Sequence, residues 1–598
     1  MIVVGYNGFS NGADLFGRLY HAAGVDRHLL IGHDAAAALM IDGELVAAVE
    51  EERLNRQKKT SDFPVNAVRW CLEQAGLGFG DVDLFAFPWR FSPDVTERMI
   101  TDLYEFPAPV ERKLEQLGRL SELYTSMLGA EAIRADFARR TGHDLDPGKL
   151  VAVPHHLAHL MCGYYVSGGA DTAFLISDGR AETLSSIMGE VRDGVVRVFD
   201  EAQISNTSSL ALLYGKLTRY LGFVPNQDEY KVMGLAAYGS APASNPLLER
   251  FVMLHDDGGY AISLPGEVRS YYAIFDRLFG GDPADRETFD YRVRVAAAAQ
   301  QLVEVVTAHQ VRAIAAATGQ ARLVFEGGLA LNCVNNSRLA RRSGFDIEVS
   351  FGASDPGVAI GAAVYATHPR LRGNRGTVSP YLGPEYDDDA LLAALRDHAD
   401  RVRWTELAAG TVAGETAKLL LEPNVVGWFQ GRTEYGPRAL GNRSILANPG
   451  FADIKDIINV RVKRREPFRP FAPVVLEEDA ARVFEMGTKR RSPYMTFVFP
   501  VRPEYRDVIP GACHVDGTAR IQTVGDAQNP PLAALLRAFT GLSGVPCLLN
   551  TSFNVAGEPI VSSPHDALET FVKTEIDYLV LGRYLVRKRE AGTGSADS

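Results

Sequence analysis

Apolar runs of strand length alternate with helical patterns in the first part of the chain. Residues 35–41 and 45–49 are mostly apolar, and Asp42-Gly43 between them is typical of a hairpin turn. A third strand is expected at 82–87, among the helical patterns that extend from residue 64 to 150. The pattern therefore predicts antiparallel strands at the start of an α/β fold, followed by helices.

Later strands end at residues that can carry chemistry. The apolar run 174–177 ends at Asp178-Gly179, and the strand-like run 345–349 is followed by Asp355. Between them, another strand-like run leads to Gly327-Gly328 and then to a helical pattern, a geometry that lets backbone approach a ligand closely. Acidic strand ends and a glycine pair of this kind recur in folds that bind ATP between two related lobes, with amides cradling phosphate and carboxylates holding its metal.

A change of composition divides the 598-residue chain. Residues 370–385 are rich in Gly, Pro and Arg, which is typical of a linker, and a new set of patterns begins near residue 391. The chain is too long for one ordinary core, so we expect one domain over residues 1–375 and a second over 376–598. The last residues, 588–598, are low in complexity and are expected to be disordered.

The overall charge limits the partners. The chain has 62 Lys and Arg against 74 Asp and Glu, a net charge of −12, so neither nucleic acid nor an anionic membrane is expected as a partner. Polar residues interrupt each apolar run before it reaches membrane-spanning length, and the N-terminus lacks a basic segment of the secretory kind. The five cysteines show no paired spacing, which fits a reducing compartment. A soluble, cytoplasmic protein is therefore expected.

A histidine-rich segment is the strongest candidate for metal binding. His155 and His159 follow Pro154 at i,i+4 spacing, so on a helix their imidazoles share one face. Asp178, at a strand end, is placed to complete the shell, and Asp355 is the expected fourth ligand. Two imidazoles with carboxylates suit iron or another transition metal better than magnesium. The alternative is that backbone groups satisfy the imidazoles and that each aspartate caps a helix or a turn.

Two basic segments stand out in the acidic chain. Residues 431–444 are turn-rich and contain three arginines, and residues 461–471 hold five basic residues within nine positions. Guanidinium groups match phosphate geometry bidentately, so this clustering indicates an anion site. The alternative is a polar face between domains. An earlier charged run, at 50–59, is expected to be the solvated face of a helix.

Seven segments resemble, in order, those of the O-carbamoyltransferases of the nodulation and antibiotic-tailoring group. They lie at 33–35, 50–53, 155–159, 229–235, 327–332, 436–441 and 465–471. One difference is the stretch from Asn11 to Leu30, which is longer than the family's usual link before its His-Asp motif. Its apolar residues could line a pocket for the acceptor, or the stretch could be a helix packed on the domain.

The resemblance implies a TsaD-like N-terminal domain of the actin/hexokinase type and a YrdC-like C-terminal domain. In such enzymes the C-terminal domain makes carbamoyl adenylate from carbamoyl phosphate and ATP, releasing phosphate and pyrophosphate. The N-terminal domain then transfers the carbamoyl group to a hydroxyl and releases AMP. The implied cofactor is Fe(II), with Mg²⁺ accompanying ATP, and the acceptor is a small molecule such as a macrolide, polyketide or sugar. A homodimer is a further expectation.

Site residues follow from the same resemblance. The C-terminal site maps to Arg438, Lys463, Arg469, Arg520, Asn550 and Ser552. The metal maps to His155, His159, Asp178 and Asp355. The N-terminal nucleotide site maps to Gly179, Lys231, Gly327, Gly328 and Asn332. His33, beside Asp34, is the hypothesised base for the acceptor hydroxyl, because imidazole titrates near neutral pH. With Arg438 and Lys463, these two residues form the expected catalytic set.

Three rival functions use parts of the same pattern. A small-molecule kinase built on the N-terminal half leaves the basic segments unexplained, and it would release ADP rather than AMP and pyrophosphate. An ATP-gated binding protein or chaperone would not need a separate anion site. A transfer-RNA-modifying enzyme conflicts with the net charge of −12.

Overall fold

The chain forms two compact units in the computed structural model, residues 1–378 and 379–598. The structure describes residues 1–9, 12–21, 32–90, 92–105, 109–263, 271–280, 283–367 and 378–589. The predicted domain boundary between residues 375 and 376 lies outside these ranges, as does most of the tail that was expected to be disordered. Each unit is therefore treated by itself.

The first sheet of the N-terminal unit combines antiparallel and parallel strands. Its strands are β1 (Ile2–Asn7), β2 (Ala36–Ile41), β3 (Glu44–Glu50), β4 (Leu84–Phe87) and β5 (Leu150–Ala152). They lie in the order β3-β2-β1-β4-β5. The first three strands are antiparallel, whereas β4 and β5 run parallel to β1. The predicted hairpin is confirmed, because Asp42 and Gly43 form the turn between β2 and β3.

A second sheet repeats this arrangement. Its strands are β6 (Thr172–Ser177), β7 (Leu184–Arg192), β8 (Val195–Val198), β9 (Ile204–Ser205), β12 (Arg322–Glu326) and β13 (Asp346–Glu348). They lie in the order β13-β12-β6-β7-β8, with β9 paired to β7. Again three antiparallel strands, β6 to β8, adjoin two strands that run parallel to the first of them. The unit thus contains two sheets of the same topology.

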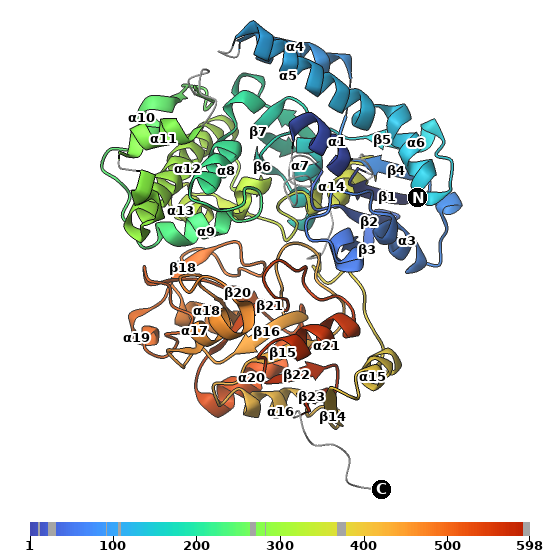
Figure 1. The fold of residues 1–598 in the computed structure, drawn as a ribbon, viewed down its shortest axis with the longest axis vertical. Coiled ribbons are helices and arrows are strands. Elements are labelled where there is room, and N and C mark those ends of the chain that lie inside the picture. Colours follow the sequence, from blue (N-terminus) through green and yellow to red (C-terminus); the bar gives the residue numbers. More distant parts are fainter. Residues whose placement is uncertain are drawn as a thin grey trace. The chain divides into compact units, whose positions relative to one another are not determined.

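Two helices pack between these sheets and exchange partners. α7 (His155–Val166) follows the last strand of the first sheet but packs on β6 and β12 of the second. α14 (Pro356–Thr367) follows the last strand of the second sheet but packs on β1, β2 and β4 of the first. The two helices also pack on each other, at the centre of the unit in Figure 1. Nearly all residues of both helices are buried.

Glycine allows the close approach of these two helices. A Cβ atom on Gly361 of α14 would lie 1.7 Å from the carbonyl oxygen of Ala158 on α7. A clash with backbone cannot be relieved by a change of rotamer, so a larger residue would push the helices apart. Ala158 is the neighbour of His159, and the separation of the helices therefore bears on the candidate metal ligands.

The other helices of this unit include α3, which packs on the first sheet, and α12, which packs on the second. In chain order they are α1 (Gly12–Tyr20), α2 (Glu51–Asn55), α3 (Val65–Glu73), α4 (Pro93–Glu105), α5 (Val110–Leu123), α6 (Ala130–Thr141), α8 (Leu210–Tyr220), α9 (Glu229–Ala236), α10 (Pro246–Phe251), α11 (Tyr271–Phe279), α12 (Phe289–Thr318) and α13 (Cys333–Arg342). A short hairpin of β10 (Val252–Leu254) and β11 (Tyr260–Ile262) lies between α10 and α11.

The charged run at 50–59 does not form a solvated helix face, so that prediction is wrong. Glu50, Glu51 and Arg53 are buried. The carboxylate of Glu51 accepts a hydrogen bond from the backbone N–H of Ala67 in α3, and burial raises its pKa to about 7. The charge pattern was misleading because the buried carboxylate of Glu51 forms hydrogen bonds with groups of another element, such as the N–H of Ala67, where a surface side chain would bind water.

The stretch expected either to line an acceptor pocket or to pack on the domain is described in part. Within α1, Leu15 and Leu19 are buried in the same apolar cluster as Trp89. This part of the stretch is therefore a helix packed on the domain. The segment from residue 22 to 30 lies outside the described ranges.

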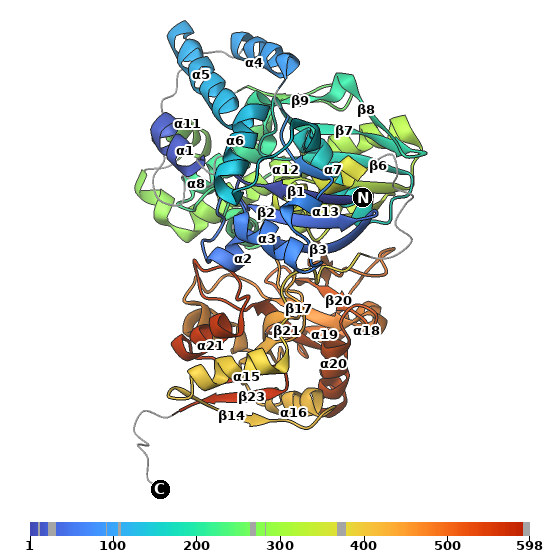
Figure 2. The same cartoon turned by 90° about the vertical axis from the view of Figure 1, so that its right-hand side faces the viewer.

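One mixed sheet of eight strands forms the frame of the C-terminal unit, with the order β14-β23-β22-β15-β16-β21-β17-β20. The strands are β14 (Val402–Glu406), β15 (Val426–Phe429), β16 (Arg443–Ala447), β17 (Ala472–Leu476), β20 (Gln522–Val524), β21 (Cys547–Ser552), β22 (Tyr578–Leu581) and β23 (Tyr584–Lys588). A separate pair consists of β18 (Val498–Pro500) and β19 (Thr518–Arg520). Figure 2 shows β14 and β23 at one edge of the large sheet.

Helices cover this sheet. α16 (Val412–Leu419) and α20 (Pro530–Ser543) pack side by side and share an apolar cluster with Trp428 of β15. α21 (Pro564–Lys573), with α15 (Asp388–Asp397) beside it, packs on β15 and β22. Shorter helices are α17 (Ile454–Ile457), α18 (Glu477–Val483) and α19 (Pro503–Arg506).

Both units combine helices with mixed sheets, which confirms the predicted α/β class. Within the described ranges, the helices lack the combination of length and apolar character that a membrane span requires.

Gly361→Ala is expected to lower the free energy of unfolding by about 3 kcal/mol, because its methyl group would overlap the backbone of α7. Urea denaturation followed by circular dichroism measures the change. Gly118→Ala is the matched control: this glycine also lies in a helix of the N-terminal unit, α5, and an added Cβ meets nothing within 4 Å. That change should stabilise the protein by about 0.5–1 kcal/mol. Similar effects of the two substitutions would contradict the packing argument.

A buried carboxyl group beside α7 makes the fold less stable as the pH rises from about 4.5 to 8. Glu326, at the end of β12, is fully buried, and its Oε1 accepts a hydrogen bond of 2.7 Å from the N–H of Ser350. Among the described residues, Oε2 has no hydrogen-bond partner. Burial raises the pKa of Glu326 from an ordinary 4.5 to about 8. The stability that this shift contributes is fully present below about pH 4.5 and is lost as the pH rises through 8.

Glu326→Gln should therefore flatten the dependence of the melting temperature on pH between about pH 4.5 and 8, since the amide cannot ionise. Thermal unfolding at a series of pH values is the measurement. Glu73→Gln, a change at an exposed position of α3, should leave the wild-type dependence intact. The argument fails if Glu326→Gln loses as much stability between about pH 4.5 and 8 as the wild type does.

Candidate metal centre and anion site

Four buried side chains from three parts of the N-terminal unit converge at one point. His155 and His159 lie in α7, Asp178 follows β6, and Asp355 directly precedes α14. One ligand atom of each residue lies within 4.8 Å of those of the other three. The predicted helix and strand end are both present, with Pro154 at the cap position of α7. The structure thus brings together the four residues proposed from the sequence.

The spacing of these atoms suits a cation rather than direct hydrogen bonds. Nε2 of His155 lies 3.7 Å from Oδ2 of Asp178 and 3.8 Å from Oδ1 of Asp355. Nε2 of His159 lies 3.9 and 3.8 Å from the same two oxygens. Within the described part of the chain, neither Nε2 has a hydrogen-bond partner. Two imidazole nitrogens and two carboxylate oxygens match the donor set of a transition metal.

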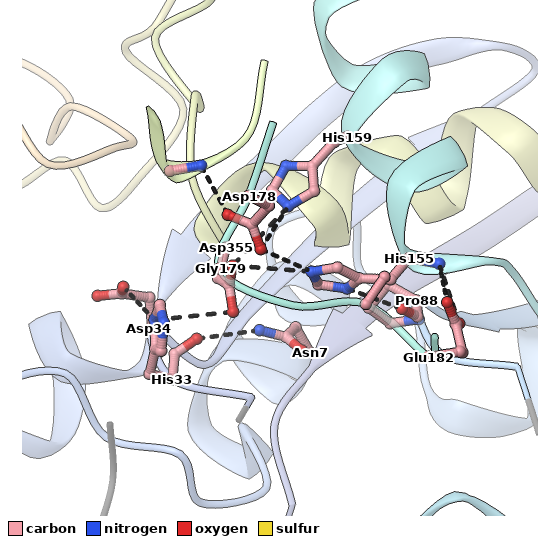
Figure 3. Close-up of polar contacts among 12 residues, drawn as sticks. Asn7, His33, Asp34, Pro88, His155, His159, Asp178, Gly179, Glu182 and Asp355 are labelled. Atoms are coloured by element: carbon pink, nitrogen blue, oxygen red, sulfur yellow. Dashed lines mark hydrogen bonds and ion pairs between the residues drawn. The ribbon is translucent and has the colours of Figure 1, made fainter. Parts of the chain in front are cut away.

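The surroundings of His155 orient its ring. Nδ1 lies 3.1 Å from the carbonyl oxygen of Pro88, so its N–H can donate there and leave the lone pair on Nε2. The indole of Trp89 stacks on the imidazole, with ring centroids 4.0 Å apart. Figure 3 shows the Nε2 side of the ring facing Asp178 and Asp355. This tautomer and orientation are those that metal binding requires.

The charges of the four groups interact strongly. Burial opposes protonation of His155, but Asp178 and Asp355 outweigh it and raise the pKa to about 9. Burial lowers the pKa of His159 well below its ordinary value. Burial raises the pKa of Asp355, whereas the two histidines hold that of Asp178 low against the effect of its own burial. A divalent cation would compensate the two carboxylates in place of protons.

His33 and Asp34 lie next to this cluster. Nδ1 of His33 is 2.8 Å from Oδ2 of Asp34 and 3.7 Å from Oδ2 of Asp355. Burial lowers the pKa of His33, but Asp355 and Asp34 together outweigh this effect and raise it. Lys59, which was not proposed from the sequence, donates a 2.8 Å hydrogen bond to Asp34. The feature of the sequence that could have identified Lys59 is its position in the charged run at residues 50–59.

The paired glycines adjoin the same carboxylate. The N–H of Gly328 donates a 2.6 Å hydrogen bond to Oδ1 of Asp178. Gly327 has a positive φ of 90°, and a Cβ there would lie 2.4 Å from the carbonyl oxygen of Ser177. The glycines therefore let β12 approach β6 and hold Asp178 in place.

The other residues predicted for nucleotide binding have structural contacts of their own. Asn332 caps α13 and exchanges hydrogen bonds with Gln300. The carbonyl of Gly179 accepts from the hydroxyl of Ser209 at 2.8 Å. Lys231, in α9, lies 3.2 Å from the carboxylate of Asp228. Gly179 directly follows Asp178, so it lies at the candidate metal centre.

In the C-terminal unit, Lys463 is the centre of a buried polar cluster. Its ammonium group donates to the carbonyl oxygen of Ser552, and it contacts the hydroxyl of the same residue at 3.3 Å. It also donates to the backbone and side-chain oxygens of Asn554, both at 2.9 Å. Lys463 and Ser552 are thus together, as predicted. Asn554, which was not proposed, belongs to the same cluster, and its place at the end of the Leu548–Asn554 stretch was the sequence signal.

Asn550 connects strand β21 to the loop that carries Arg438. It lies on β21, and its amide donates to the carbonyl of Ala439 at 3.3 Å and to Gln522 at 2.7 Å. Glu434 organises the same loop, because its Oε1 accepts from the N–H groups of Leu440, Asn442 and Arg443. Arg469 contacts Glu466 at 3.3 Å, and Arg520 ends β19.

Two of the three arginines in the segment 431–444 have structural partners, and neither of them was among the predicted site residues. Arg443 is fully buried, donates to the carbonyls of Gln430, Gly431, Asn442, Pro384 and Ser562, and stacks on Phe429. Arg432 donates to the carbonyls of Leu382 and Gly383. Arg438 is therefore the arginine of this segment that remains a candidate for anion binding.

Two family models match the chain. The one described as carbamoyltransferase N-terminus matches residues 21–364, and the one described as carbamoyltransferase C-terminus matches residues 417–588. Nodulation protein NolNO of Sinorhizobium fredii is 38% identical over 569 residues, which cover 94% of this chain and 79% of that protein. Nodulation protein NolO of Bradyrhizobium diazoefficiens is 40% identical over 446 residues, covering 73% and 79% respectively.

Two solved structures resemble the chain distantly. Component A of Acidaminococcus fermentans (R)-2-hydroxyglutaryl-CoA dehydratase has a TM-score of 0.32 at 13% identity, and the alignment covers 61% of this chain and 97% of that one. HypF of T. kodakarensis has a TM-score of 0.30 at 11% identity, covering 63% and 49%. Likenesses this low carry no argument about the fold.

Proposed function

Since the chain belongs to the carbamoyltransferase family and is a carbamoyl-transferring enzyme, we propose that it uses ATP and carbamoyl phosphate to carbamoylate a hydroxyl group of a small molecule. The observation that carries the proposal is the pair of distinct sites, one in each unit. The N-terminal unit holds the buried cluster of His155, His159, Asp178 and Asp355. The C-terminal unit holds the buried cation Lys463.

The C-terminal unit is proposed to make carbamoyl adenylate, with release of phosphate and pyrophosphate. Both substrates are polyanions, so their close approach requires cations at fixed positions. Lys463 and Arg438 are the groups proposed to bring them together, with Arg469, Arg520, Asn550 and Ser552 as further contacts. Oxygen atoms of Ser552 and Asn554 surround the ammonium group of Lys463, and this supports the role because it fixes the position of the charge. Mg²⁺ is proposed to accompany ATP.

The N-terminal unit is proposed to transfer the carbamoyl group and to release AMP. Fe(II), or another divalent transition metal, is the proposed cofactor of the cluster around His155. When bound, such a cation would act as a Lewis acid and stabilise the negative charge on the phosphate of the leaving AMP. His33 is proposed to take the proton from the acceptor hydroxyl, and Asp34 to hold its ring. The glycine pair and Gly179 are proposed to lie against the adenylate, with Lys231 and Asn332 further along the site.

The acceptor is proposed to be a macrolide, polyketide or sugar alcohol. The domain types are proposed to be TsaD-like, of the actin/hexokinase type, in the N-terminal unit and YrdC-like in the C-terminal unit. Support for the first comes from the two sheets of the same topology, which agree with two related lobes. A cytoplasmic location and a homodimer stay predictions. The kinase and the ATP-gated binding protein are less favoured, because family membership accounts for both halves of the chain.

The function is tested by mass spectrometry of reactions that contain carbamoyl phosphate, ATP, Fe(II) and a panel of hydroxylated natural products. We expect a gain of about 43 Da on the acceptor, which is the net addition of CONH, together with AMP and pyrophosphate. Lys463→Ala should reduce acceptor-independent pyrophosphate release at least about 100-fold, because it removes a buried charge from the activating site. Exposed Lys418→Ala is the control. Release of ADP in place of AMP and pyrophosphate would instead support a small-molecule kinase.

Two variants test the role of the metal ligands and the role of the base in carbamoyl transfer independently. His159→Ala and His33→Ala should each lower transfer from supplied carbamoyl adenylate by about 100-fold or more. His159→Ala should also lose divalent-cation binding, measured by equilibrium dialysis, whereas His33→Ala should keep it. Pyrophosphate release without acceptor should be near normal in both. Near-normal transfer by His33→Ala would remove that residue as the base, and loss of pyrophosphate release in His159→Ala would refute the division into two sites.

A further inference from the structure

Glu182 is a partly buried carboxylate beside the metal cluster that the proposed mechanism leaves without a role. It lies in the connection between β6 and β7, shortly after Asp178. Its side chain faces the start of α7 rather than the four candidate ligands. Figure 3 shows the carboxylate of Glu182 at the backbone N–H of His155. Nε2 of the same histidine faces Asp178 and Asp355 instead.

The carboxylate joins two backbone segments. Oε1 accepts a hydrogen bond of 3.1 Å from the N–H of His155 and one of 2.8 Å from the N–H of Arg90. Oε2 lies 3.4 Å from the N–H of His155. The connection that carries Glu182 is itself anchored, because the hydroxyl of Tyr124 donates to its carbonyl oxygen. The side chain is therefore fixed at both ends.

The segment that Glu182 holds is also the one that orients the ring of His155. Pro88 supplies the carbonyl oxygen that lies 3.1 Å from Nδ1. Trp89 supplies the indole that stacks on the ring. Both residues directly precede Arg90, whose N–H binds Glu182. One carboxylate therefore links the backbone of the ligand to the groups that set its tautomer and its tilt.

The carboxylate of Glu182 also accepts a hydrogen bond from an N–H group at the start of α7. The first N–H groups of a helix have no partner within the helix, and the positive end of the helix dipole favours an anion there. Pro154, at the cap position, has no side-chain acceptor to offer. Glu182 supplies that acceptor from a distant part of the chain, and hydrogen bonds to a charged group are among the stronger ones in proteins.

We infer that Glu182 is a positioning residue of the metal centre. Its carboxylate fixes the first turn of α7 and the segment Pro88–Arg90 in the relation that directs Nε2 of His155 towards Asp178 and Asp355. This inference rests on the proposed metal site. It adds a residue that acts through His155 and touches neither cation nor substrate.

Binding of Co(II) to the full-length protein tests the inference, because the visible absorption of this ion reports the geometry of its ligands. Glu182→Ala should weaken Co(II) binding by about 10–100-fold and change the spectrum of the bound ion. Glu182→Asp keeps the charge but is one methylene shorter, so it should change the spectrum as well. Glu182→Gln keeps an acceptor oxygen of the same reach, and it should restore the wild-type spectrum and most of the affinity.

The exposed Glu201→Ala serves as a control for the loss of one negative charge in the same unit, and it should bind Co(II) as the wild type does. Wild-type affinity and spectrum in both Glu182→Ala and Glu182→Asp would overturn the role of Glu182 and leave the metal site standing. If Glu182→Ala does not fold, the spectrum of Glu182→Asp decides the matter. Failure of the wild type to bind Co(II) would overturn the metal site and this inference together.

Discussion

The contact between α7 and α14 is the constraint on which the N-terminal unit depends. Each helix follows the last strand of one sheet and packs on the other sheet, so the two halves of the unit are linked through this crossing. A glycine at residue 361 allows backbone to approach backbone. The crossing places His155 and His159, from one helix, opposite Asp355 at the start of the other. A metal ion bound at this point would contact residues from both halves of the unit.

Burial gives the charged groups of this protein two different uses. Around His155, carboxylates and imidazoles face one another at 3.7–3.9 Å, too far apart for direct hydrogen bonds. Arg443 is buried just as completely, but carbonyl oxygens accept its donors. The spacing around His155 suits a cation, whereas the hydrogen bonds of Arg443 stabilise a loop. Both sets of groups are buried, so what distinguishes Arg443 from the cluster around His155 is that backbone carbonyls accept its hydrogen bonds.

The family assignment and the two sites describe one division of labour. Carbamoyl transfer to an alcohol needs an activated carbamoyl donor, and making that donor needs cations that tolerate two polyanions. In the C-terminal unit, Lys463 supplies such a cation, and its position is fixed by hydrogen bonds to Asn554. The other unit supplies buried ligands and His33 next to them. Each unit is therefore suited to one half of the proposed reaction.

Local patterns determined a large part of this picture. Alternation and turn residues predicted the hairpin at Asp42-Gly43, and i,i+4 spacing placed His155 and His159 on one face of a helix, because both signals act within a few residues. Glycines after a strand predicted the turn that now holds Asp178. The grouping of Asp178 with Asp355 also followed from the sequence, through acidic strand ends and family resemblance.

Only the tertiary structure decided which charged side chains are buried and what satisfies them. Glu51 and Arg443 belong to charged runs that pattern alone assigns to surface or to anion binding. Glu182 carries no motif, yet it contacts Arg90 and His155, which are far from it in the chain. Such roles depend on long-range packing that brings an unmarked residue to a helix start. Sequence periodicity reports which face of an element is apolar, but not which distant group will meet it.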